Sequence, residues 1–140
     1  MGNIDIVSDM LIRIKNANMI KSSTVIIIKN CLTLSITKLL KDEGFIESFE
    51  ECGPVYLTEN SFVNKHISLT LKYKGIKQNP YITNLKRISK PGLRVYVNCR
   101  NIPKVLGGIG TAVCASSKGI LTDRMAKSIN IGGEILFYIW

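Results

Sequence analysis

The stretch that decides the fold is residues 113–124, which read VCASSKGILTDR. The apolar run before it, residues 109–115, predicts a strand that stops at two serines and a lysine. Gly119 then allows a turn, and Thr122 and Asp123 are residue types that cap helix N-termini. We therefore expect a strand-end loop that leads into a helix. Hydroxyls, one cation and a helix N-terminus together suit phosphates and ribose hydroxyls, although a solvated turn is the competing interpretation.

Positive charge is concentrated in the second half of the chain. The 140 residues carry 19 Lys and Arg against 10 acids, a formal net charge of +9. Residues 1–74 hold nine of these cations and eight acids, whereas residues 75–140 hold ten cations and two acids, Asp123 and Glu134. A charge that served only solubility would have no reason to segregate in this way. The asymmetry favours a nucleic-acid partner for the second half.

The first half predicts a small lobe of helices and strands. Apolar residues at helical spacing begin at Ile4, a β-branched run spans residues 24–28, and Asn30 is a good N-cap for a second helix that ends at Gly44. Strands are expected at residues 45–49 and 66–73. The polar segment 74–80, interrupted by Gly75 and Pro80, is a candidate linker, so we place the domains at residues 1–74 and 75–140.

The second half predicts a sheet-rich lobe. We expect residues 82–88 and 93–97 to pair as a hairpin through the Pro91-Gly92 turn, a short helical turn near 101–105, the strand and helix described above, and a terminal strand over 134–140. The predicted fold class is α+β, with two small lobes. The N-terminal lobe reads helix-strand-helix-strand-strand, and the C-terminal lobe is mostly antiparallel with one or two short helices.

Several function classes are disfavoured. Residues 107–110 lack the spacing of a dinucleotide or phosphate-binding loop, and the four cysteines form no C-x-x-C pair, so no cofactor or metal site is predicted. Cys31 and Cys114 are expected to be buried free thiols. No run is long enough to span a membrane. A serine hydrolase is the weakest hypothesis, because Lys118 lacks a serine at the required spacing and His66, expected at the surface, is the single histidine.

Two residues of the second half could act on a base. Tyr96 is either a stacking platform for an unpaired base or a half-buried sheet tyrosine, and the residues alone leave both open. Glu134 would repel phosphate, so it would accept a hydrogen bond from a base amino group or orient a neighbouring side chain.

An ordered set of motifs resembles the family of small-subunit ribosomal protein eight along the whole chain. The motifs are DMLIRIKN at 9–16, EGFIE at 43–47, KRISKPGLRVY at 86–96, PKVLGGIG at 103–110, SSKGILTDR at 116–124 and GGE at 132–134. The ending Tyr138-Ile139-Trp140 and residues 84–87 are similar to the plastid-encoded branch.

The resemblance implies a non-enzymatic constituent of the small ribosomal subunit. It implies a primary rRNA-binding protein that grips an irregular stem in the central domain of the small-subunit rRNA and helps to assemble the platform. The implied partners are this rRNA and neighbouring small-subunit proteins, with no membrane and no small-molecule substrate. The expected location is the plastid (chloroplast) stroma, with the bacterial cytoplasm as the alternative, and the lack of a transit peptide fits a product made inside the organelle. A free-standing RNA- or DNA-binding regulator on the same scaffold is the second hypothesis.

The resemblance also implies which residues contact RNA. The serine loop, Tyr96 and Glu134 would meet the distorted core of the stem, while the first helix and the Lys72 region would touch its backbone. The expected RNA-binding residues are Asp5, Asp9, Arg13, Asn16, Lys29, Asn30, Lys72, Arg87, Ser89, Pro91, Gly92, Arg94, Tyr96, Ser116, Ser117, Lys118, Gly119, Thr122, Arg124, Gly133 and Glu134. Two departures stand out: Ala115 replaces a serine that usually opens the loop, and residues 28–31 differ from the usual start of the second helix.

Overall fold

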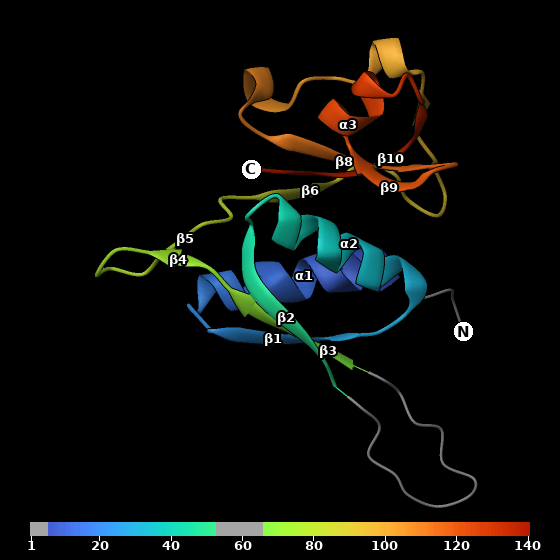
Figure 1. Ribbon diagram of the computed structural model, residues 1–140. Helices are drawn as coiled ribbons and strands as arrows, with labels where there is room; N and C mark the ends of the chain where they lie inside the picture. Colours follow the sequence, from blue (N-terminus) through green and yellow to red (C-terminus); the bar gives the residue numbers. More distant parts are fainter. Residues whose placement is uncertain (1–5, 53–65) are drawn as a thin grey trace, which may run out of the picture. The chain divides into compact units, whose positions relative to one another are not determined.

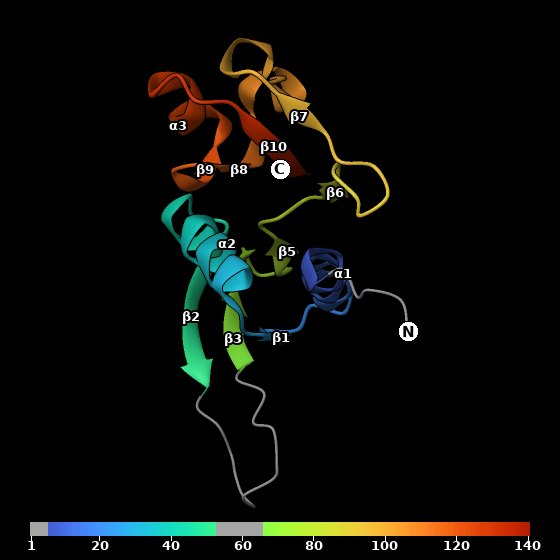
Figure 2. The same cartoon turned by 90° about the vertical axis from the view of Figure 1, so that its right-hand side faces the viewer.

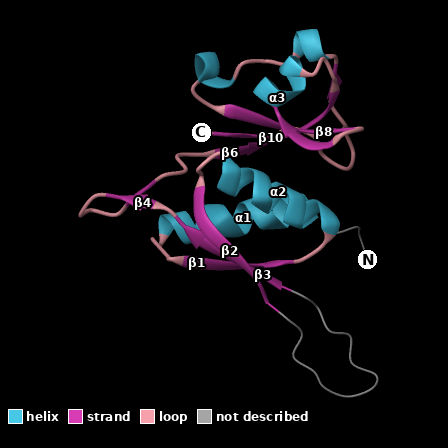
Figure 3. Ribbon diagram, in the orientation of Figure 1, coloured by secondary structure: helices cyan, strands magenta, loops and turns pink. Residues whose placement is uncertain are grey.

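The computed structural model describes residues 6–52 and 66–140, which form two compact units, Ile6–Tyr81 and Ile82–Trp140. Each unit contains its own antiparallel sheet and helical segments (Figures 1 and 3), so the α+β fold class is confirmed. The domain boundary at 74/75 remains a prediction. The polar segment expected to be a linker is instead a hairpin of β4 (Tyr73–Lys74) and β5 (Asn79–Pro80), which belongs to the first unit.

The first unit packs two helices on one face of a three-stranded sheet. The elements are α1 (Ile6–Met19), β1 (Thr24–Ile28), α2 (Cys31–Asp42), β2 (Ile46–Cys52) and β3 (His66–Leu71), and the strand order is β1-β3-β2. Alternate residues of β1 and β3 are buried, and both helices lie on the same side of the sheet (Figure 1). The core therefore lies between this face and the helical stripe that includes Val7, Leu11 and Ile14.

The second helix begins where the sequence predicts. The Asn30 side chain accepts a hydrogen bond from the backbone N–H of Thr33 at 2.7 Å, and the Thr33 hydroxyl accepts one from the backbone N–H of Asn30 at 2.8 Å. This reciprocal capping box satisfies two donors that the first helical turn leaves unpaired. Gly44 follows the helix with φ +83°, a left-handed conformation that glycine adopts without a steric penalty.

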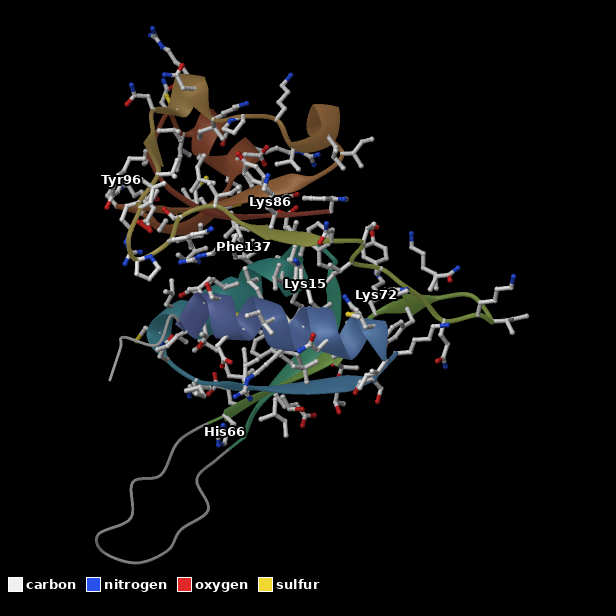
Figure 4. The ribbon with its side chains drawn as sticks, turned by 180° about the vertical axis from the view of Figure 1, so that it is seen from behind. Lys15, His66, Lys72, Lys86, Tyr96 and Phe137 are labelled. Carbon is white, nitrogen blue, oxygen red and sulfur yellow. The ribbon has the colours of Figure 1, made fainter. Side chains whose placement is uncertain are left out.

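The second unit is built around the long C-terminal strand. It contains β6 (Leu85–Arg87), β7 (Tyr96–Val97), β8 (Thr111–Ser116), β9 (Gly119–Thr122), α3 (Asp123–Ser128) and β10 (Gly133–Ile139), with two 3₁₀ turns at Cys99–Asn101 and Val105–Gly108. The strand order is β6-β10-β8-β9, and β7 also pairs with β10 (Figure 2). Phe137 of β10 is fully buried (Figure 4), so the terminal strand is the centre of this sheet and not a tail.

Three local predictions were wrong. Residues 82–88 and 93–97 do not pair with each other, because β10 is long enough to pair with β6 at 137–139 and with β7 at 133–134. Residues 119–121, expected to belong to the loop that leads into the helix, instead lie in β9, because the turn after Ser116 is tight enough for the chain to pair back on β8. Cys31 is exposed at the start of α2, whereas Cys114 is buried as expected.

No helix of the described residues is long and apolar enough to cross a membrane. Within the same residues, no group of three or more His, Cys, Asp or Glu side chains is placed to hold a metal ion.

Candidate nucleic-acid interface

The serine loop is the tight turn of the β8–β9 hairpin. Ser116 pairs with Gly119, and Ser117 and Lys118 form the two exposed residues between them. The Ser116 hydroxyl donates to the Gly119 carbonyl at 2.9 Å and accepts from the Lys118 N–H at 3.2 Å, while Gly119 has φ +103°. The Ser116 hydroxyl therefore shapes the turn. The Ser117 hydroxyl makes no hydrogen bond within the described residues, so it is available to a ligand.

Tyr96 and Glu134 lie beside this loop on neighbouring strands. Glu134 of β10 pairs with Tyr96 on one side and with Ala115 on the other, so the three residues form one cross-strand row. Directly paired residues of an antiparallel sheet point to the same face. The row thus places an aromatic ring, a carboxylate and the strand that carries the serine loop next to one another.

The Tyr96 ring is available for stacking. It is 70% exposed, and Figure 4 shows it at the margin of the second unit. Of the two interpretations left open by the sequence, the half-buried sheet tyrosine does not describe this residue. An exposed aromatic face next to cations suits an unpaired base.

Glu134 is covered and paired. Its side chain is 13% exposed and accepts a hydrogen bond from Arg94 at 3.2 Å. This contact matches the expectation that Glu134 orients a neighbouring side chain. The ion pair also offsets the repulsion that an isolated carboxylate here would exert on phosphate.

A hollow of about 500 Å³ opens next to this row. It is lined by Tyr96, Val97, Asn98, Asn101, Gly132 and Gly133. Asn98, Asn101 and Gly132 are not among the site residues that the sequence predicts. The signal in the sequence was weak: Asn98 directly follows the strand that carries Tyr96, and Asn101 lies at the end of the next turn. Only the pairing of β7 with β10 brings the Gly132-Gly133 step to them.

The two adjacent glycines allow the strands to approach closely. A Cβ on Gly133 would lie 2.2 Å from the Ala115 carbonyl oxygen, and one on Gly132 would lie 2.5 Å from the Val97 carbonyl oxygen. Both distances are far below any normal contact, so the glycines are required where β10 passes between β7 and β8. Gly133 therefore acts by positioning Glu134 and the serine loop.

The second unit presents a strongly basic surface. Residues 82–140 contain nine Lys and Arg and two acids, and both acidic side chains are covered: Asp123 is 4% exposed and Glu134 is the paired residue described above. Lys86, Lys90, Arg100, Lys104 and Lys118 are exposed. Because neither carboxylate is fully exposed, the exposed charges of this unit are mainly positive.

Other predicted site residues of this unit have structural contacts. Ser89 is fully buried, and its hydroxyl accepts from the Val95 N–H at 2.8 Å. Thr122 caps α3 by accepting from the Met125 N–H at 3.2 Å, and Arg124 donates to the Gly108 carbonyl at 2.6 Å. Pro91 and Gly92 lie exposed in the turn closed by Lys90 and Leu93, and Arg87 lies on β6, paired with Phe137. Direct RNA contacts by these residues stay predictions.

Predicted site residues of the first unit are dispersed. Asp9 and Arg13 form an ion pair of 3.0 Å on α1, Asn16 is exposed further along the same helix, and Lys29 pairs with Glu51 at 2.7 Å. The Asn30 side chain is used by the capping box. Lys72 is exposed at the base of the β4–β5 hairpin (Figure 4), and Asp5 lies outside the described residues.

Burial shifts the pKa of two groups beneath the interface. Burial raises the pKa of the Cys114 thiol to about 11, and the Asp123 carboxylate adds to the effect. Burial likewise raises the pKa of Tyr138, with a further contribution from Cys114. Both groups are therefore neutral at physiological pH and act as core residues and not as nucleophiles.

Comparison with known proteins gives a consistent result over the whole chain. A family model described as Ribosomal protein S8 matches residues 5–140. The chain is 54% identical over 140 residues to the small ribosomal subunit protein uS8c of Euglena gracilis, covering 100% of both chains. It is 53% identical over 136 residues to uS8 of Rippkaea orientalis, covering 97% of each chain, and 51% identical over 136 residues to uS8c of Chlorokybus atmophyticus, covering 97% of this chain and 98% of that one.

Proposed function

Because the chain belongs to the ribosomal protein S8 family, and is thereby a non-enzymatic structural constituent of the small ribosomal subunit, we propose that it binds the central domain of the small-subunit rRNA. In this proposal it grips an irregular stem there and helps to assemble the platform. Its relatives include plastid uS8c proteins and cyanobacterial uS8 proteins, and its place of action is the small ribosomal subunit of the plastid.

The observation that carries the proposal is the cross-strand row of Tyr96, Glu134 and Ala115 beside the exposed Ser117-Lys118 turn. It combines a stacking surface, a free hydroxyl and a cation on one rigid sheet. Sequence-specific RNA recognition targets unpaired bases and 2′-hydroxyls, because side chains cannot read the deep groove of an RNA duplex. A stem with a distorted core would offer both features, whereas a regular duplex would not.

The cations would supply affinity, and the polar and aromatic side chains would supply recognition of the RNA. The exposed cations of the second unit would bind phosphates and supply affinity that falls with salt. Ser117 would donate to, or accept from, a 2′-hydroxyl or base edge, and Tyr96 would stack on a base at the mouth of the adjacent hollow. Arg94, paired with Glu134, would contact the base or ribose next to it and add little to the salt-dependent part of the affinity.

Hydrolase chemistry is not part of the proposal. His66 belongs to the other unit, and Ser117 has no general base at hydrogen-bond distance among the described residues. This agrees with the non-enzymatic character of the family.

Footprinting on full-length small-subunit rRNA tests the proposal directly. We expect the purified protein to protect one contiguous site in the central domain. Sedimentation provides the test of location, since the protein should travel with small ribosomal subunits in plastid extracts. A protein that remains in the free fractions and protects no defined site would instead support the regulator hypothesis.

A pair of variants separates the two kinds of contact. Ser117→Ala should weaken binding equally at all salt concentrations, because it removes a hydrogen bond and no charge. Lys118→Ala should reduce the slope of log affinity against log salt by about one. If both variants shift the slope alike, the assigned roles of Ser117 and Lys118 are wrong.

A further inference from the structure

The β8 strand of the second unit has the serine loop at one end and an exposed apolar turn at the other. This turn consists of the 3₁₀ segment Val105–Gly108 and Ile109, directly before β8 begins at Thr111. We propose that these five residues, which we call the apolar turn, dock on a neighbouring protein of the small subunit, in an apolar socket whose rim carries carboxylates. The inference requires that the chain belongs to the small subunit, and it does not depend on the proposed rRNA site.

The apolar turn exposes two large aliphatic side chains. Leu106 is 55% exposed and Ile109 is 82% exposed, and Met125 of α3 is 47% exposed. The Arg124 side chain donates to the Gly108 carbonyl at 2.6 Å, so the first turn of α3, which includes Met125, is joined to the apolar turn. Single exposed apolar residues are common on monomeric proteins, whereas several on adjoining segments are typical of an interaction site.

The backbone of the apolar turn is held in a conformation that leucine rarely adopts. Leu106 has φ +50° and ψ +46°, in the left-handed region where glycine would fit without a steric penalty. Two backbone hydrogen bonds close the turn: the Ile109 N–H donates to the Leu106 carbonyl at 3.3 Å, and the Gly110 N–H donates to the Val105 carbonyl at 3.0 Å. A strained residue that keeps an exposed apolar side chain indicates a function for that side chain.

The charges beside the apolar turn are positive. Lys104, directly before the turn, and Arg124 are both exposed. Neither acid of the second unit offsets them, because Asp123 is buried and Glu134 lies at the serine-loop end of β8, where it pairs with Ala115. Protein interfaces combine an apolar centre with a polar rim, and complementary charges select the partner. The socket that fits these side chains therefore carries Asp or Glu at its edge.

The apolar turn and the serine loop can be occupied at the same time. They lie at opposite ends of β8 (Thr111–Ser116), which separates them by about 17 Å. Aliphatic side chains neither pair with phosphates nor stack on bases as aromatic rings do, so a protein suits this end of the strand better than RNA. A contact this small is weak by itself, but two proteins held in one particle meet at a high effective concentration.

The experiment places the photoreactive amino acid p-benzoylphenylalanine at position 109 of the full chain. The matched control carries it at position 76, because Ile76 is also fully exposed but lies in the other unit. Each chain is reconstituted with small-subunit rRNA and the other small-subunit proteins, and the particles are purified by sedimentation and irradiated. We expect the label at 109 to reach one neighbouring protein, in a peptide that contains apolar residues and Asp or Glu, and the label at 76 not to reach that peptide.

A second pair of variants measures the contribution of the contact. Ile109→Asp puts a carboxylate against the expected acidic rim, and Ile76→Asp is its control. Because burial of an isoleucine is lost, Ile109→Asp should weaken the binding of one neighbouring protein to the reconstituted particle roughly tenfold or more, and Ile76→Asp should leave it unchanged. Both variants should bind rRNA alone as the wild type does. If the labelled chain does not assemble, this pair decides.

The failures are distinguishable. A label at 109 that reaches only rRNA, a second copy of this chain or no molecule at all overturns the inference. Equal effects of Ile109→Asp and Ile76→Asp on every neighbouring protein overturn it as well. Binding of the wild-type chain to the central domain of the rRNA is measured separately, and its failure refutes the proposed function, whereas the cross-link from position 109 tests the apolar turn by itself.

Discussion

Gly133→Ala gives the most direct test of how the fold builds the interface. The new Cβ would lie 2.2 Å from the Ala115 carbonyl oxygen, 3.0 Å from the carbonyl carbon and 3.2 Å from the Ser116 Cα. All three are backbone atoms of a central strand pair, so no flexible side chain can move aside. Relief would require the backbones of β8 and β10 to separate by roughly 1 Å. Overpacking of this kind costs about 1–3 kcal/mol, and we expect the upper end because the obstacle is backbone.

The assay is urea unfolding followed by the fluorescence of Trp140, the single tryptophan, which lies in the second unit and packs against its core. For a slope of about 1.5 kcal/mol per molar urea, a loss of about 3 kcal/mol lowers the midpoint by roughly 2 M. Gly92→Ala is the matched control, because a Cβ there meets nothing within 4 Å. It should change the stability by less than about 1 kcal/mol. Equal midpoints for the two variants would show that the close approach at Gly133 does not constrain the sheet.

Two further predictions concern the same unit. Thr122→Ala should lower its stability by about 1 kcal/mol because the cap that holds the Met125 N–H is lost, and the urea midpoint of Trp140 fluorescence measures this; Thr122→Ser should restore most of the loss. Cys114 should make stability fall at alkaline pH. Its pKa rises from 9.0 to about 11 on folding, so the stability that the neutral thiol contributes is complete below pH 9 and is lost as the pH rises toward 11. At pH 10 the loss is about 1.4 kcal/mol, and Cys114→Ala should remove that part of the decline between pH 7 and pH 10; an unchanged decline would mean that the thiol does not carry it.

The elements that the sequence predicts correctly depend on local signals. The apolar stripe of α1, the Asn30 cap and the Gly44 terminus each act within one or two helical turns, and the structure confirms all three. The strand at 24–28 is confirmed for a similar reason, since a β-branched run favours extended backbone whatever its partner.

Strand pairing is where local reasoning was insufficient. The turn at Pro91-Gly92 suggested a hairpin, but the partner of Tyr96 is Glu134, and that pairing depends on two glycines more than thirty residues away. Adjacent glycines in a sequence indicate a turn as readily as a close approach of strands. Whether Gly132 and Gly133 form a turn or a close approach depends on β7 and β8, the strands on either side of β10. A pattern read from the residues around the glycines does not include those strands.

The candidate site also combines residues that local sequence predicts with residues that only long-range strand pairing brings together. Ser117, Lys118 and Tyr96 were chosen by residue type and are exposed in the structure, whereas Ser89 has the right chemistry and is buried. Asn98 and Asn101 were not predicted, because they line the hollow only when β7 pairs with β10. Residue type indicates which chemistry is possible, and long-range register decides which side chains meet.

The net charge of each half of the chain does not show which cations are available to RNA, because some of them are already paired with carboxylates. On the first unit, Arg13 and Lys29 are neutralised by Asp9 and Glu51, so these cations contribute little to the field felt by an approaching RNA. Lys86 and Lys118 of the second unit have no carboxylate partner among the described residues, and neither do Lys72, Lys74 and Lys77 of the first unit. A counted charge attracts a polyanion only where no neighbouring carboxylate has already paired with it. The salt dependence of binding should therefore follow these unpaired lysines. It should be nearly insensitive to Arg13 on α1 and to Lys29 just after β1, although both were expected to contact the RNA.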